Sequence, residues 1–210
     1  MKQVPTPTSV PSESTVEQIA NHQILCLVSP YGAWFYVPTK REEKRLAYDA
    51  SLQGHKALVI QYKRFIPSNN SGRVNLSPKQ HGQLKKNFPP AATPYVFYGF
   101  ALHATYDQIT TQFADGFGFL FGVWTVFVDV HSIPAGARSI SVRFDPFLSV
   151  MSGRGKASVP FWCLPTLVRE FQSCKTGLRA DLALELPREP NVDTRRQTLP
   201  NLNILWARIA

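Results

Sequence analysis

The residues whose types and spacing could support chemistry lie in one segment, REEKRLAYDASLQGHKALVIQYKR, which runs from Arg41 to Arg64. Within it, Asp49 precedes a strand pattern that ends in Gln61, Tyr62 and Lys63. Hard divalent cations take oxygen ligands, which the Asp49 carboxylate, the Gln61 amide and the Tyr62 carbonyl could supply. The Lys63 ammonium could stabilise charge that develops during phosphoryl transfer. The segment therefore predicts a site for a divalent metal and a phosphate.

Two neighbouring strands must position these groups. Residues 47–52 and 56–65 have strand patterns, and Gln53–His55 predicts a turn between them. We therefore expect an antiparallel hairpin in which Asp49 lies beside Gln61.

The alternation of side chains along the second strand decides which groups can meet. Successive side chains point to opposite faces, so Gln61 and Lys63 should share one face, with Ile60 and Tyr62 on the other. A site at the end of such a strand is supported by the rigid sheet behind it.

A short helix should precede the hairpin. Thr39 followed three residues later by Glu42 is a capping-box pattern, which predicts a helix over residues 40–47. Because Glu42 is explained by this cap, Glu43 is the carboxylate that the helix can offer to the site.

The remaining patterns predict a mixed α/β core, because helix and strand patterns are interspersed along the chain. Ser77 as N-cap and Pro78 at the first helical position predict a helix that runs to about Asn87. On this helix we expect His81 to lie at the surface. Further patterns predict a loop over residues 67–72, strands over 94–101, 123–130 and 139–144, and a helix over 164–173.

The length and composition suit one globular domain: the chain has 210 residues, of which 44% are hydrophobic and 18% charged. The Pro-, Ser- and Thr-rich residues 1–15 predict a flexible N-terminal arm, which leaves residues 16–210 as a single α/β domain. No apolar run approaches the roughly 20 residues needed to span a bilayer, and the N-terminus has no apolar signal-peptide core. We therefore expect a cytoplasmic protein without a membrane partner.

The net charge points to a polyanionic partner. Twenty-three Lys and Arg against fourteen Asp and Glu give +9, which favours binding to nucleic acid, either DNA or RNA. The three cysteines are odd in number and lack metal-ligand spacing, so we expect reduced thiols in a reducing compartment. The sequence leaves open whether the protein forms a homodimer or binds a protein partner.

Residues 39–101 resemble the PD-(D/E)xK nuclease superfamily, which has a restriction-endonuclease-like fold with a mixed sheet flanked by helices. Its α-β-β-β-α-β core carries an acidic residue on the first helix, Asp on the second strand and E-x-K on the third. In this chain, Gln61–Lys63 stands at the E-x-K position. The resemblance makes the C-terminal half an elaboration of the core. It also implies a catalytic set of Glu43, Asp49, Gln61 and Lys63, and ligation of Mg²⁺ or Mn²⁺ by Asp49, Gln61 and Tyr62.

Two departures from the family pattern bear on function. Gln61 stands where the family has Glu or Asp, which removes a metal-directed charge, and Tyr48 rather than Pro precedes Asp49. The first function that stays open is a Mg²⁺-dependent endonuclease that hydrolyses DNA or RNA; the resemblance alone suggests a role in defence or in mobile elements. The second is a catalytically inactive nucleic-acid-binding module of the same fold. The third is a basic structural or assembly protein with an acidic partner.

Overall fold

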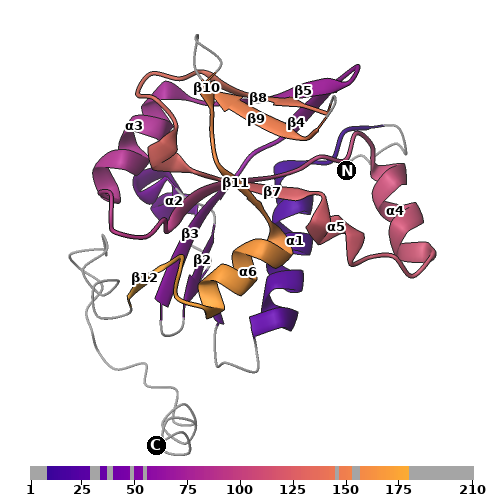
Figure 1. The fold of residues 1–210 in the computed structure, drawn as a ribbon, viewed down its shortest axis with the longest axis horizontal. Helices are drawn as coiled ribbons and strands as arrows, with labels where there is room; N and C mark the ends of the chain where they lie inside the picture. Colours follow the sequence, from indigo (N-terminus) through magenta and orange to yellow (C-terminus); the bar gives the residue numbers. More distant parts are fainter. Residues whose placement is uncertain are drawn as a thin grey trace, which may run out of the picture.

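The computed structural model describes residues 9–28, 34–36, 40–47, 50–53, 56–144, 147–152 and 157–179. Over these residues the chain is a mixed α/β protein built on two sheets (Figure 1). The mixed α/β class that the sequence predicts is therefore confirmed.

The larger sheet carries the strand that was predicted to hold the site. Strand β3 (Lys56–Tyr62) lies inside this sheet and is buried along its whole length. It pairs antiparallel with β2 (Ala50–Gln53), which confirms the expected hairpin, and parallel with β6 (Val96–Ala101). The other strands are β1 (Trp34–Tyr36) beside β2, β7 (Thr125–Asp129) beside β6, β11 (Phe161–Cys163) beside β7, and β12 (Leu178–Arg179), which pairs with the start of β3.

Helices lie on both sides of this sheet (Figure 1). On one face, Ile60 and Tyr62 join an apolar cluster with α1 (Glu13–Val28), α5 (Leu120–Val123) and α6 (Leu164–Gln172). On the other face, α3 (Pro78–Asn87) packs against the sheet and contacts α2 (Lys40–Leu46). Helix α4 (Tyr106–Ala114) contacts α5.

The second sheet packs on the α3 side of the first and is antiparallel throughout. Its strands, in spatial order, are β10 (Ala157–Ser158), β9 (Ser149–Ser152), β8 (Ser139–Arg143), β5 (Ser71–Asn75) and β4 (Phe65–Ser68). The sequence-based expectation was wrong here in two respects. The strand predicted over residues 56–65 ends at Tyr62, and Phe65 begins β4 of the second sheet. Residues 67–72, expected to be a loop, form most of the β4–β5 hairpin.

The N-terminal region is more ordered than the composition suggested. Helix α1 begins at Glu13, inside the segment that was expected to be a flexible arm. The Ser12 hydroxyl accepts a hydrogen bond from Thr15 N, and the Ser9 carbonyl accepts one from Tyr106 N of α4. These contacts hold the start of α1 against α4.

Two further findings bear on expectations drawn from the sequence. All three cysteines are free thiols. Among the described residues, no helix combines the length and the apolarity that crossing a bilayer requires.

Candidate functional site

Gln61 is enclosed between the sheet and α3, with only 1% of its surface exposed. Its Oε1 accepts a 2.9 Å hydrogen bond from Gln80 Nε2 of α3, and its Nε2 donates a 3.1 Å bond to the Tyr62 carbonyl. The Tyr62 side chain points to the other face, where its hydroxyl donates to Asn21 Oδ1 of α1 at 2.7 Å. The predicted alternation is therefore confirmed for these two residues. An sp² oxygen has two lone pairs, so a hydrogen bond to a predicted ligand oxygen does not by itself exclude a metal.

Lys63 follows β3 directly and continues its ladder. Its backbone N–H donates to the Gly99 carbonyl of β6 at 2.9 Å, and the residue is only 8% exposed. Among the described residues, none forms a hydrogen bond or an ion pair with its ammonium group. The ammonium therefore has no protein partner among the described residues and could bind an anion such as phosphate.

A carboxylate that the sequence analysis missed lies at the same strand end. Glu13, in the first turn of α1, accepts a 3.2 Å hydrogen bond at Oε1 from Arg64 N. The start of α1 is fixed in turn by α4, because the hydroxyl groups of Thr15 and Tyr106 are 2.6 Å apart. Burial acts to raise the pKa of Tyr106, but hydrogen bonds from hydroxyl groups at the start of α1 and the charge of Arg64 outweigh it and lower that pKa. The start of α1 therefore contacts both the start of α4 and the residues that follow β3.

Asp49 lies outside the described residues. The structure does define its sequence neighbour: Ala50 pairs with Ile60, the residue that precedes Gln61 in β3. Within the described part of the chain, no three His, Cys, Asp or Glu side chains cluster closely enough to hold a metal ion.

Glu43 belongs to α2 by its backbone, whereas its side chain is outside the described part. Helix α2 is held to α3 by its Arg45 carbonyl, which accepts hydrogen bonds from Gln83 Nε2 and from Asn87 Nδ2, the latter at 3.1 Å. Since Gln80 of α3 also contacts Gln61, one helix connects α2 with the end of β3.

The expectation that His81 lies at the surface is wrong, because the residue is only 1% exposed. Its Nδ1 lies 3.1 Å from the Tyr98 hydroxyl of β6, and its buried Nε2 has no hydrogen-bond partner. Burial lowers the pKa of His81, and the charge of Lys85 lowers it further, whereas the carbonyl groups of Pro134 and Ile133 act in the opposite direction. His81 thus connects α3 with β6 in the protein interior.

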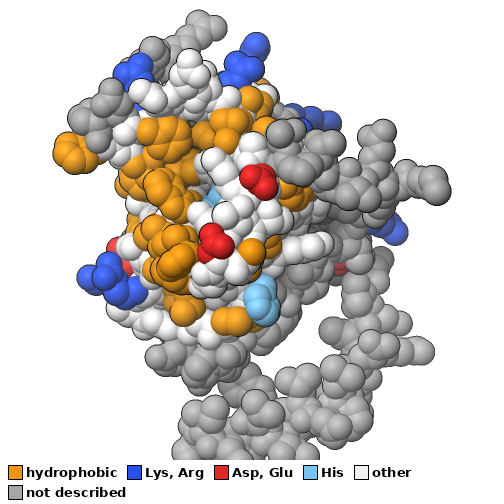
Figure 2. Space-filling model, turned by 90° about the vertical axis from the view of Figure 1, so that its right-hand side faces the viewer, with side chains coloured by type: hydrophobic (Ala, Val, Ile, Leu, Met, Phe, Trp, Pro, Cys, Tyr) orange, Lys and Arg blue, Asp and Glu red, His pale blue; other side chains and the backbone are white. Residues whose placement is uncertain are grey.

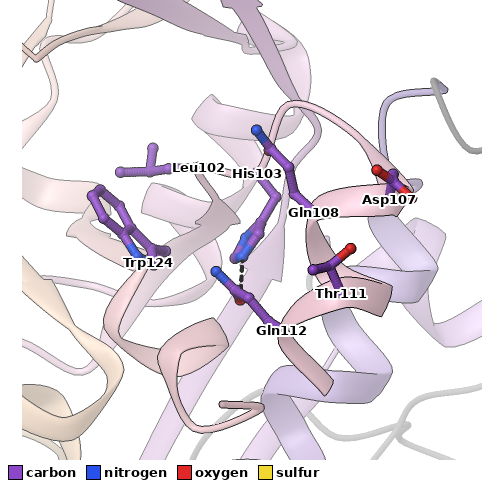
Figure 3. A pocket seen from close by; sticks show the side chains of 7 residues that line it. All are labelled: Leu102, His103, Asp107, Gln108, Thr111, Gln112 and Trp124. Atoms are coloured by element: carbon purple, nitrogen blue, oxygen red, sulfur yellow. Dashed lines mark hydrogen bonds between the residues drawn. The ribbon is translucent and has the colours of Figure 1, made fainter. Parts of the chain in front are cut away.

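An open pocket of about 570 Å³ lies beyond the end of β6 (Figure 3). In it, His103 donates from Nε2 to Gln112 Oε1 at 2.9 Å, and its ring stacks on Phe121. Burial lowers the pKa of His103, although the Gln112 hydrogen bond opposes this effect. Asp107 is the one charged residue of the lining, so the pocket does not favour phosphate. The lining consists of Leu102, His103, Asp107, Gln108, Thr111, Gln112 and Trp124.

The surface around α4 and α5 is unusually apolar. Phe117, Phe119 and Trp124 are 52%, 64% and 44% exposed. Figure 2 shows hydrophobic side chains gathered on this face, with acidic groups among them and Lys and Arg toward its margins. Contiguous apolar surface often marks a contact region, but the acidic groups here disfavour a nucleic acid.

Comparison with known proteins finds no counterpart: no family model, curated protein or solved structure matches the chain. The function must therefore be inferred from the residues themselves.

Proposed function

We propose that the chain is a metal-dependent nuclease whose site lies at the carboxyl end of β3. The observation that carries this proposal is that the Lys63 side chain, the buried Gln61 amide and the α1 carboxylate of Glu13 all lie at that strand end. Glu13 accepts a hydrogen bond from Arg64 N, directly after Lys63, whose side chain is almost fully enclosed. A carboxylate and an ammonium beside a metal are the groups that phosphodiester hydrolysis uses.

The order of the elements supports the resemblance to the PD-(D/E)xK superfamily. Elements α1, β1, β2, β3, α3 and β6 follow the α-β-β-β-α-β order of that family, with α2, β4 and β5 as additions. Because α2 lies between β1 and β2, the family's first helix corresponds to α1 rather than α2. The proposed helix carboxylate is therefore Glu13 in place of Glu43.

In this proposal, Asp49 and the oxygen atoms of Gln61 and Tyr62 would hold Mg²⁺ or Mn²⁺. The metal would neutralise phosphate charge and lower the pKa of a bound water. Lys63 would bind the phosphate and stabilise the negative charge that develops on it, and Glu13 would accept hydrogen bonds from the attacking water. Since Gln61 is neutral, Asp49 and Glu13 supply the negative charge, and we expect modest affinity for the cation.

One observation favours a second function, that of an inactive nucleic-acid-binding module. Both ends of the Gln61 amide are engaged in hydrogen bonds within the protein, and the side chain is buried. A glutamine in this state can serve structure alone. The module would then bind nucleic acid through the basic surface and would need no metal.

Cleavage assays distinguish the two functions. Purified protein is incubated with labelled DNA and RNA, single- and double-stranded, in Mg²⁺, Mn²⁺ or EDTA. The nuclease proposal expects metal-dependent products, and Lys63→Met should reduce their rate by at least about 100-fold because it removes one charge-stabilising donor. Lys79→Met, on the exposed side of α3, is the matched control and should cleave like wild type. Wild-type protein that binds these substrates but never cleaves them would support the binding module.

A further inference from the structure

The second sheet has one face in the protein core and one in solvent. Along β5, Val74 is buried whereas Arg73 and Asn75 are exposed, and along β8, Val142 is buried whereas Arg143 is exposed. Because paired residues on neighbouring strands point to the same side, the same alternation of buried and exposed residues extends across the second sheet. We call the solvent side the outer face; by the register it includes Arg73, Arg143, Asn75, the serines Ser71, Ser139, Ser141 and Ser149, and the apolar residues Ile66 and Met151.

We infer that the outer face binds the sugar–phosphate backbone of duplex nucleic acid, an inference that takes its class of partner from the proposed function. Charge complementarity is the first support. The five strands contain two arginines and no Asp or Glu. Arg73 pairs with Ser141 and Arg143 pairs with Ser71, so the two arginines are diagonal neighbours on adjacent strands. Diagonal neighbours lie about 7–8 Å apart, which lets both guanidinium groups contact phosphates of one strand.

The uncharged residues of the outer face indicate that its partner is a duplex rather than a single strand. Serine hydroxyl groups donate hydrogen bonds to phosphate and sugar oxygens without reading sequence. Proteins that bind single strands stack the bases on aromatic side chains, and the five strands present none outward, since Phe65 faces the core. The two arginines and the serine hydroxyl groups therefore suit a backbone whose bases are paired.

The position of the outer face connects it with the proposed site. Only Lys63 and Arg64 separate the end of β3 from the start of β4. Figure 1 shows the second sheet as the upper layer of the molecule, above the strand ends of the larger sheet. The second sheet therefore begins directly after the strand that carries the proposed site.

The test measures binding of the full chain to fluorescent DNA and RNA duplexes of about 20 base pairs by anisotropy, over a series of salt concentrations. The charge reversals Arg73→Glu and Arg143→Glu, combined, should weaken duplex binding at least about tenfold at low salt. They should also make the slope of log K against log salt shallower by about two, because each lost phosphate contact removes about 0.9. Arg169→Glu, an exposed arginine on α6, is the matched control and should bind within about twofold of wild type.

Three results would overturn the inference. One is unchanged duplex binding by the double variant, another is an equal loss in the Arg169→Glu control, and the third is tighter wild-type binding to single strands than to duplexes. The substituted arginines are exposed, and circular dichroism checks that the variants stay folded.

Hydrolysis of bis(p-nitrophenyl) phosphate separates this inference from the proposed function. This small phosphodiester needs no docking surface, so the double variant should hydrolyse it like wild type while losing duplex binding. If wild type binds duplexes through the outer face but never hydrolyses the small ester, the nuclease proposal fails and the docking surface stands.

Discussion

Gln80 on α3 donates a 2.9 Å hydrogen bond to the buried Oε1 of Gln61 at the end of β3. This contact fixes the amide that stands at the E-x-K position of the proposed site. It also connects β3 to α3, the helix that carries His81 and Lys85 and that donates hydrogen bonds to the Arg45 carbonyl at the end of α2. The end of β3 is thus a structural junction as well as a candidate site.

Replacing Gln80 with Leu should lower the free energy of unfolding by about 1–3 kcal/mol, because it removes the donor to a buried amide oxygen. Urea denaturation measures the effect. Replacing both glutamines, as Gln61→Leu with Gln80→Leu, should restore part of the loss because no unpaired oxygen remains. A Gln80→Leu protein as stable as wild type would show that the contact contributes nothing.

Replacing Gln61 with Glu should preserve or raise cleavage, since it restores the charge that the family pattern has at this position. Without a metal, the buried carboxylate should lower the melting temperature, and Mn²⁺ should then raise it more in this variant than in wild type. Thermal denaturation with Mn²⁺ or EDTA measures both effects. If Mn²⁺ raised the melting temperatures of variant and wild type equally, Gln61 would not be a metal ligand.

Replacing Asp49 with Asn should abolish cleavage while the protein stays folded, because it removes a charged ligand. Cleavage by wild type should need high Mg²⁺ or prefer Mn²⁺, which nitrogen and oxygen ligands bind more strongly. Initial rates against metal concentration give the comparison. Full activity of the Asp49→Asn protein would assign the cleavage to other residues.

The stability of the protein should fall as the pH drops below 6.5. Burial holds the pKa values of His81 and His103 below their ordinary value of 6.5, so as the pH falls the unfolded chain takes up these protons before the folded protein does. Their contribution is complete above this pH and is lost as the pH falls toward the folded pKa values. The slope reaches at most about 1.4 kcal/mol per pH unit for each histidine.

Urea denaturation at about pH 7.5 and pH 5.5 measures this dependence. His81→Asn should flatten it, and His22→Asn, at an exposed position of α1, should not. Identical pH dependence in wild type and His81→Asn would remove His81 as a cause.

Elements with local signals could be predicted from the sequence. Helix α3 begins as expected, because Ser77 accepts a hydrogen bond from Gln80 N and Pro78 follows it. The β2–β3 hairpin and strand β6 also follow from apolar runs between turn residues. In each case the signal lies within the element itself.

The second sheet could not be predicted in the same way. Strand β5 (SGRVN) carries Ser, Gly and Asn, which are typical of loops, and it is a strand because β8 pairs with it from nearly seventy residues away. His81 was misplaced for a related reason, since the Tyr98 hydroxyl that accommodates it lies on another strand.

In the proposed site, Glu13 of α1 takes the place of Glu43, the helix carboxylate that the sequence predicts. Glu43 and Asp49 are only six residues apart, which leaves no room for the first strand of the resembled core between them. If the resemblance holds, that spacing favours a carboxylate from an earlier helix. Glu13 itself carries no local motif, and the proposal of this residue draws on its contact with Arg64 N.

Paramagnetic broadening by Mn²⁺ tests the central claim, a cation site at the end of β3, most directly. In amide NMR spectra, substoichiometric Mn²⁺ should broaden the signals of Gln61, Lys63 and Glu13 first, and Asp49→Asn should abolish this effect. Signals of β10, which lies at the edge of the second sheet opposite β4, should stay sharp at the same metal concentration. Broadening confined to the acidic residues around α4, or none at all, would contradict a metal site at the end of β3.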